Sequence, residues 1–343
     1  MICGIGCAEE VGGDEVETDV VGGMDARIFG GSTDDDKAGA SNVVALKVGD
    51  EGEYELCSGA LVAPNVVLTA RHCVAKVLTA TVTCDENGSS TNGRHVKGNL
   101  PPSHIKVYTG ASPRFSSEPI AVGKKIIAPD SDTLCDADIA LVVLDAEVPD
   151  VEPFAVRVGS KVGVVDGETV RSVGYGQNDK RMPLGTRLKK DNVSVLAMGR
   201  GISASKTALG VNEFEVGRSI CEGDSGGPAI SEETGAVIGV VSRGGNCNDD
   251  FGHIYIATAR FKELFDRAFA AAGGAPIVET GQPEGPQTKA NPVALREPPP
   301  ETETTLKTSA GGCSAAPGRE TGAGSLLLAL AAVVVLRRRH NRR

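Results

Sequence analysis

The sequence lacks tryptophan, and aromatic residues make up only 3% of its 343 residues. Glycine and proline are abundant instead, with 44 and 18 copies, a composition that favours many short strands and turns over long helices. Basic residues are outnumbered by acidic ones, and the net charge of −10 argues against a nucleic-acid partner. We therefore expect one β-rich folded domain with extensions.

Metal-ligand patterns are also missing. The nine cysteines include no Cys-x-x-Cys pair of the zinc type, and His95, His104 and His340 show no metal-like spacing. We therefore predict no metal and no cofactor, and interpret these three histidines as surface residues. Nine cysteines without such spacing indicate disulfides and an oxidising compartment.

The sequence also lacks an apolar run long enough to span a membrane. The apolar stretch near the C-terminus, 322–336, would be about 22 Å long as a helix, shorter than the roughly 30 Å hydrocarbon core of a bilayer. At the other end, Met1–Cys7 is too short for the apolar region of a signal peptide and has no basic residue before it. The sequence therefore does not reveal the export route that its cysteines suggest.

The most informative stretch is Cys221–Pro228, which reads Cys-Glu-Gly-Asp-Ser-Gly-Gly-Pro. A serine between glycines exposes its hydroxyl on a tight turn beside free backbone N–H groups, which suits a nucleophile with an anion site. Such a hydroxyl needs a base and a group that orients the base. His72, in Leu68–Cys73, supplies an imidazole, and Asp138, in Asp136–Leu141, supplies a carboxylate that enters an apolar strand.

The order His72, Asp138, Ser225, with these flanking residues, resembles the trypsin/chymotrypsin-like serine proteases over residues 28–272. The resemblance implies an all-β fold of two antiparallel six-stranded β-barrels with the active site between them and a C-terminal helix. It also implies a Ser-His-Asp triad and an oxyanion hole formed by the N–H groups of Gly223 and Ser225. The protein would then be a monomeric serine endopeptidase acting on proteins or peptides. The alternative is a non-catalytic binding or adhesion protein of the same fold at the cell surface.

Short apolar runs bounded by glycine, proline and asparagine support this fold, since strands of this length and spacing are typical of antiparallel barrels. Strands are expected at 43–46, 66–68, 105–108 and 139–144 in the first half and at 162–165, 237–241 and 254–256 in the second. A helix should close the domain, because apolar residues fall on one face at 3.6-residue spacing: Phe261, Leu264, Phe265, Ala268 and Phe269.

The segment Arg27–Gly31 resembles the activation site of the same family, a basic residue followed by Ile-Val-Gly-Gly. Cleavage after Arg27 would free an ammonium at Ile28. In the family this group turns inward and pairs with the acid before the nucleophile, here Asp224. A buried charge pair is tolerable only when both partners are present. The resemblance therefore implies a zymogen that is activated by cleavage between Arg27 and Ile28.

The resemblance also places a specificity pocket, with Ser219 at its floor and Gly244 on one wall. The opposite wall is Gly252 or His253, depending on a one-residue shift in the loop, and an inward His253 would make the pocket narrow and polar. A neutral Ser219 argues against cleavage after arginine or lysine, since a buried cation there would lack a partner. The enzyme would then not cut its own activation bond, and we expect a separate activating protease.

Four other charged residues lie near these motifs. Asp136 points the same way as Asp138 on a period-two strand but lacks the following Ile-Ala-Leu, so Asp138 is favoured. Arg243 stands where the family usually has tryptophan, which leaves the contacts to upstream substrate residues open. Asp249 and Asp250 are interpreted as solvated turn residues, and the alternative is that they supply negative charge to the pocket from the side.

Six cysteines of the domain are expected to pair as Cys57–Cys73, Cys221–Cys247 and Cys84–Cys135. The first two pairs follow from the resemblance, as the bridge of the histidine loop and the bridge from the serine loop to the pocket wall. The third pair joins the two cysteines that remain, and two free buried thiols are the alternative. Each bridge would contribute on the order of 3 kcal/mol to stability.

The remaining segments are interpreted from composition. Residues 1–27 form an acidic leader or propeptide with too little apolar surface to pack, and 273–312 is a proline-rich spacer. Residues 313–343 combine Cys313, the apolar stretch and an arginine cluster, and so resemble the C-terminal sorting tails of myxobacterial surface proteins. That resemblance implies export, processing by an envelope sorting machinery near Cys313, and anchoring at the cell surface or release. A plain tail anchor is the alternative.

Overall fold

The computed structural model describes residues 32–33, 42–50, 53–160, 163–176, 185–244, 247, 249–250 and 252–280. The predicted activation bond Arg27–Ile28, the acidic leader, Cys313 and the tail lie outside the described residues. No helix in the described segments combines the length and the apolarity needed to cross a membrane.

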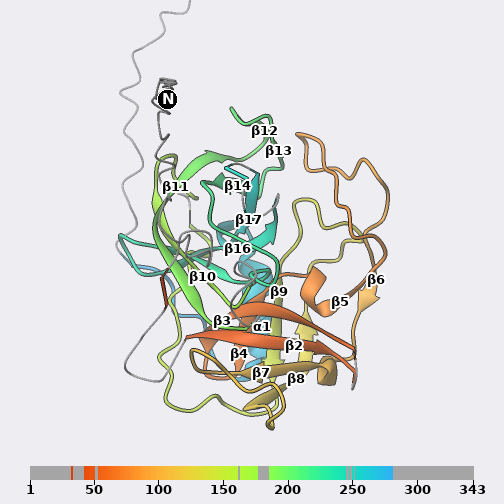
Figure 1. Ribbon diagram of the computed structural model, residues 1–343, viewed down its shortest axis with the longest axis vertical. Helices are drawn as coiled ribbons and strands as arrows, with labels where there is room; N and C mark the ends of the chain where they lie inside the picture. The colour runs from red at the N-terminus through yellow and green to blue at the C-terminus, as the bar shows by residue number, and fades with distance from the viewer. Residues whose placement is uncertain are drawn as a thin grey trace, which may run out of the picture. The chain divides into compact units, whose positions relative to one another are not determined.

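Six antiparallel strands of the first half close into a barrel in the order β2-β3-β4-β9-β8-β7. Their bounds are β2 Val43–Gly49, β3 Tyr54–Ala63, β4 Val66–Thr69, β7 Ile105–Tyr108, β8 Ala121–Ile127 and β9 Ala140–Leu144. Two further strands, β5 (Ala75–Val77) and β6 (Val96–Asn99), pair with each other outside the barrel. Figure 1 shows the labelled strands of this barrel in the lower half of the view.

The second half forms another antiparallel barrel, in the order β11-β10-β15-β16-β17-β14, which closes because β14 also pairs with β11. Its strands are β10 Thr169–Gly174, β11 Leu188–Met198, β14 Glu213–Val216, β15 Pro228–Ser231, β16 Val237–Arg243 and β17 His253–Ala257. The short β1 (Ser32–Thr33) pairs with β11, and β12 (Gly201–Ile202) pairs with β13 (Ala208–Leu209). The prediction of two six-stranded barrels is confirmed.

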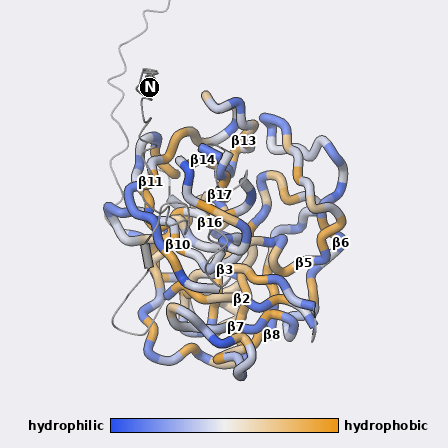
Figure 2. Tube along the Cα trace, viewed as in Figure 1, coloured by the Kyte–Doolittle hydropathy of each residue, from blue (hydrophilic) through white to orange (hydrophobic). Residues whose placement is uncertain are grey.

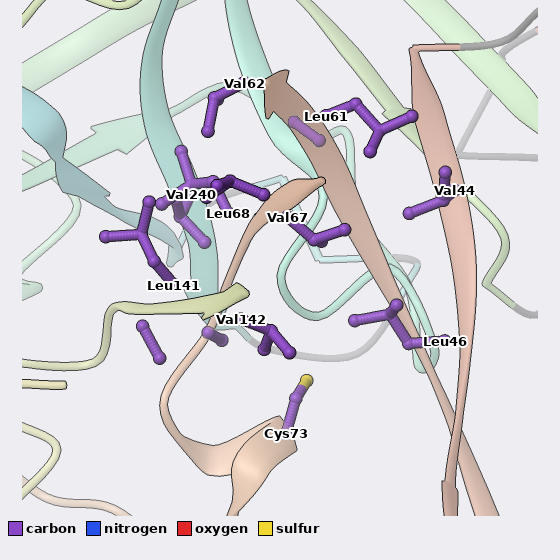
Figure 3. Close-up of a cluster of buried hydrophobic side chains, with 14 of the residues drawn as sticks. Val44, Leu46, Leu61, Val62, Val67, Leu68, Cys73, Leu141, Val142 and Val240 are labelled. Atoms are coloured by element: carbon purple, nitrogen blue, oxygen red, sulfur yellow. The ribbon is translucent and has the colours of Figure 1, made fainter. Parts of the chain in front are cut away.

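Two strands of the first barrel, β4 and β9, are buried at every residue and apolar except for Thr69, because both their faces are covered. Val66, Val67 and Leu68 of β4 are all fully buried. Figure 3 shows side chains of β3, β4 and β9 meeting in one cluster, which Val240 of β16 joins. Figure 2 shows hydrophobic residues recurring along the strands, with hydrophilic residues among them and in the connecting loops. Burial of these side chains contributes on the order of 1.5–3 kcal/mol each to folding.

The predicted C-terminal helix is present as α1 (Lys262–Ala272). Its buried face consists of Leu264, Phe265, Ala268 and Phe269, and it packs against β4, β8 and β9 of the first barrel. The helix ends at Gly273, whose φ of 85° is the left-handed conformation that glycine adopts without strain, and whose N–H donates to the carbonyl of Phe269. The periodicity of the sequence therefore identified both the helix and the face it buries.

The strand expected at 162–165 is wrong, because the described residues 163–165 belong to no strand and β10 begins at Thr169. The N–H of Val165 donates to Glu168 Oε2 over 3.2 Å, and the carbonyl of Gly163 accepts a hydrogen bond from Arg157. These backbone groups bind side chains instead of a neighbouring strand.

The chain continues against the body beyond α1. The N–H of Val156 donates to the carbonyl of Ile277 over 2.8 Å, and the N–H of Glu279 donates to the carbonyl of Val156 over 3.0 Å. Arg157 is 0% exposed, and its guanidinium binds the carboxylates of Glu168 and Glu279 over 2.7–2.9 Å. Residues as far as Glu279 are thus held by the body, although composition assigns the spacer from 273 onward.

Candidate active site

A cleft of about 910 Å³ receives residues from both barrels. His72 and Asp138 line it from the first barrel, and Ser225 and Ser242 line it from the second. The segment 77–82 forms a further part of the wall. The three residues that the sequence predicts to act together therefore share one cleft.

The histidine follows the end of β4 by three residues and begins a short 3₁₀ helix (His72–Val74). Its Nδ1 lies 2.8 Å from Asp138 Oδ2, and its backbone N–H donates to Asp138 Oδ1 over 2.9 Å. The hydroxyl of Ser242 donates to Asp138 Oδ2 over 2.7 Å. Because the carboxylate accepts from Nδ1, the proton of a neutral imidazole resides there and Nε2 keeps a free lone pair. This is the tautomer that a general base requires.

Burial and charge shift the pKa of each member of this pair in opposite directions. Burial disfavours the ionised carboxylate of Asp138, which is 1% exposed, but the charge of His72 and the hydrogen bonds that it and Ser242 donate outweigh this and lower the pKa of Asp138. Burial likewise disfavours the imidazolium, yet the charge and hydrogen bond of Asp138 outweigh burial and raise the pKa of His72. The pair thus favours an ionised aspartate beside an imidazole whose pKa is raised above its ordinary value.

Ser225 lies in a tight turn that two glycines make possible. Gly223 and Gly226 have φ values of 94° and 80°. A Cβ on Gly226 would lie 2.1 Å from Thr69 Oγ1, so no larger residue fits there. The N–H of Ser58 donates to the carbonyl of Ser225 over 2.8 Å, and the Ser58 hydroxyl donates to the carbonyl of Gly223 over 3.0 Å. The first barrel therefore fixes the serine turn of the second. Within the described residues, Ser225 Oγ makes no hydrogen bond to His72.

Asp224, which precedes the serine, is buried at 1% exposure. Its Oδ1 accepts the N–H of Gly176 and its Oδ2 accepts the N–H of Cys221, each over 2.8 Å. No cation of the described residues pairs with it. Burial outweighs the two hydrogen bonds and raises the pKa of Asp224 to about 7. A cation placed beside Asp224 would therefore strongly stabilise its ionised carboxylate.

The three expected disulfides are present: Cys57–Cys73, Cys84–Cys135 and Cys221–Cys247. The first joins β3 to the short helix of His72, and the second ends three residues before Asp138. Cys57, Cys73 and His72 are the one group in the described residues close enough to share a metal ion. Both sulfurs of that group are bonded to each other, so neither is a thiolate ligand.

The residues predicted for the specificity pocket are only partly in the cleft. Gly244 lines it, and so does Gly252, the alternative to His253 for the opposite wall. Ser219 and His253 are both 0% exposed and do not line the cleft. The Nε2 of His253 lies 2.7 Å from the carbonyl oxygen of Asp249.

Comparison with known proteins decides the family, since the family model described as Trypsin matches residues 28–264. The chain belongs to the trypsin family. Cercarial protease of Schistosoma mansoni is 32% identical over 56% of this chain and 72% of that protein. Serine protease SP24D of Anopheles gambiae is 30% identical, over 60% of this chain and 68% of that protein. Trypsin alpha-4 of Lucilia cuprina is 24% identical, over 72% of this chain and 88% of that protein.

One buried ion pair beside the site has no counterpart in the predictions. Arg243 lines the cleft, and its guanidinium binds both carboxylate oxygens of Glu213 over 2.6 and 2.8 Å. Glu213 also accepts the N–H of Asp136 over 2.8 Å. Asp136 itself accepts the N–H of Asn212 and makes no hydrogen bond to His72 within the described residues. No local signal identifies the pairing of Glu213 with Arg243 and Asp136, because these two partners are 30 and 77 residues away in the sequence.

The interpretation of His95 as a surface residue is wrong, because its side chain is 0% exposed. Its Nδ1 accepts the N–H of Leu134 over 3.0 Å, and its Nε2 lies 2.7 Å from Asn92 Oδ1. The ring is tolerated inside because both nitrogens are satisfied. Leu134, which it fixes, lines the cleft.

Proposed function

We propose that this member of the trypsin family is a serine endopeptidase whose nucleophile is Ser225. The observation that carries the proposal is the orientation of His72 by Asp138 and Ser242, in the same cleft as Ser225. A non-catalytic binding protein is not favoured, because such a protein has no need of a histidine held in the tautomer of a general base.

The chemistry follows from these positions. As Ser225 Oγ attacks the carbonyl carbon of a peptide bond, His72 Nε2 accepts its proton and then returns it to the leaving amine. Asp138 keeps the imidazole oriented and stabilises its charged form. The N–H groups of Gly223 and Ser225 bind the oxyanion, and the loss of one such donor costs on the order of a hundred- to a thousandfold in rate.

The second part of the proposal is that the protein is made as a zymogen. Cleavage between Arg27 and Ile28 would supply an ammonium group, and Asp224 is the buried carboxylate that would receive it. The absence of a cationic partner for Asp224 within the described residues supports this role. Since Ser219 is neutral, we propose that another protease cuts this bond.

The location of the protein is proposed from its sequence. Disulfides are stable in an oxidising compartment, so three of them support export. The tail from Cys313 would then be processed by an envelope sorting machinery, leaving the enzyme at the cell surface or released.

Replacement of Ser225 tests the proposed activity. Protein cut at Ile28 should hydrolyse unstructured protein substrates, Ser225→Ala should abolish hydrolysis while the fold is retained, and Ser116→Ala, an exposed serine, should have no effect. Peptidase activity retained by purified Ser225→Ala protein would overturn the proposal.

A further inference from the structure

We infer that the enzyme cleaves after small residues such as glycine, alanine and serine, because Ile220 and His253 close the space that a larger side chain would enter. The inference rests on the proposed function and names the substrate class of the same site. The side chain concerned belongs to the residue whose carbonyl carbon Ser225 attacks.

The space beside Ser225 lies between two segments of the second half of the chain. One is the loop that precedes the serine, represented in the cleft by Ile220 and Glu222. The other is the end of β16 and the residues that follow it, represented by Ser242 and Gly244. A substrate side chain next to the scissile bond has to enter between these segments.

Ile220 almost touches the opposite segment. A Cβ placed on Gly244 would lie 3.1 Å from Ile220 Cδ1 and 3.5 Å from the carbonyl oxygen of Gly252. A methylene group needs about 3.5–4 Å to its neighbours on each side, so segments that hold one between them stand about 7–8 Å apart. The gap between Ile220 and Gly244 is narrower than that. A long or branched side chain therefore cannot pass unless Ile220 is displaced.

The imidazole of His253 fills the space behind this gap. Its Nδ1 lies 3.5 Å from the same Cβ position on Gly244, and both His253 and Ser219 are 0% exposed. The Nε2 faces the carbonyl oxygen of Asp249, which can only accept, so Nε2 carries the proton and the ring is held in place. The Nδ1 has no hydrogen bond within the described residues. The imidazole therefore occupies space that water would fill in an open pocket.

A peptide library that varies the residue before the scissile bond tests the inference. Protein cut at Ile28 is first titrated with a fluorophosphonate, so that rates refer to active molecules. For the unaltered enzyme, kcat/KM for alanine should exceed that for phenylalanine or lysine on the order of a hundredfold. In the double variant Ile220→Ala, His253→Gly, the ratio of alanine to phenylalanine should fall by about tenfold or more.

Two further variants make the result specific. Ile220→Ala alone opens only the entrance between Ile220 and Gly244. It should increase cleavage after valine and leucine more than cleavage after phenylalanine. This single variant provides the test if the double variant does not fold. Ile202→Ala changes an isoleucine that is 58% exposed and outside the cleft, and should leave the preference unchanged.

The outcomes separate this inference from the proposed function. A cut protein that does not react with the fluorophosphonate contradicts the proposed function. A protein that reacts but cleaves after phenylalanine or lysine as fast as after alanine overturns the inference alone. An unchanged preference in folded Ile220→Ala protein also overturns it.

Discussion

Asp138 shows how a single carboxylate determines the state of a neighbouring base. It accepts hydrogen bonds from Nδ1 and the backbone N–H of His72 and from the hydroxyl of Ser242. These donors keep it ionised in spite of burial, and its charge in turn raises the pKa of His72. Asp136, only two residues away, binds other groups, so this role belongs to one of two otherwise similar residues.

Asp138→Asn should therefore reduce kcat on the order of 10⁴-fold, which is the effect known for this substitution in the trypsin-type triad. The raised pKa of His72 sets the acid limb of the pH profile, since the imidazole must be neutral to accept a proton. Without the charge of Asp138 that limb should move to lower pH. Rates measured from pH 5 to 9 check both effects.

The matched control is Asp136→Asn, which removes the same charge two residues earlier. Its amide oxygen still accepts the N–H of Asn212, so activity and the acid limb should change little. If both variants lose activity equally, the separate role of Asp138 is contradicted.

At the scale of elements, apolar runs and helical periodicity predicted most strands and α1, because local burial determines those patterns. The failures share one cause, which is hydrogen bonding by polar side chains that hydrophobic periodicity does not reflect. Residues 163–165 are not a strand because Arg157 and Glu168 bind their backbone. His95 is inside because Leu134 and Asn92 satisfy its ring. Composition cannot reveal such partners.

The segment after α1 gives the clearest example, since Glu279 lies in a region of spacer-like composition and yet binds the buried Arg157. In Glu279→Gln the amide offers one acceptor oxygen where the carboxylate offers two, so one N–H of the buried Arg157 guanidinium loses its partner. Because Arg157 keeps its ion pair with Glu168, we expect the free energy of unfolding to fall by about 1–3 kcal/mol, the cost of leaving a buried donor without a partner. Urea denaturation measures it.

Glu233→Gln, an exposed acid, is the control for this change and should shift stability by less than about 0.5 kcal/mol. Equal stability of the two variants would show that the segment containing Glu279 is not held by Arg157.

At the scale of the whole molecule, His72, Asp138 and Ser225 meet in one cleft because the motif that contains each of them lies at a fixed position in the two-barrel fold. The motifs do not contain the residues that hold them there, such as Ser242, or those that shape the specificity pocket, such as Ile220. Ser242 acts through a hydrogen bond between the two halves of the chain and Ile220 through packing within the second half, and motif spacing encodes neither contact.

In the uncut chain, ionisation of the buried Asp224 should lower the free energy of unfolding by a measurable amount. Its folded pKa of about 7 exceeds the ordinary value of 3.8, so the folded state binds a proton more tightly than the unfolded state. Stability from this group is then greatest below pH 4, falls as the pH rises to about 7, and is constant above that. The full difference is on the order of 4 kcal/mol. Chemical denaturation from pH 4 to 8 measures it.

Asp224→Asn should remove this fall with pH in the uncut protein, whereas Asp166→Asn, an exposed residue, should not. Cleavage at Ile28 should also remove it, since the new ammonium favours the ionised carboxylate. A fall with pH that persists after cleavage would contradict the proposed pairing of Ile28 with Asp224.

The most direct test of the central claim is to react the folded protein, before and after cleavage at Ile28, with a fluorophosphonate and to locate the adduct by mass spectrometry of its peptides. The account predicts one adduct per molecule of cut protein, on Ser225, with little reaction of the uncut chain and a large loss of reaction in His72→Ala. Reaction at another residue, or at Ser225 without dependence on His72, would contradict it.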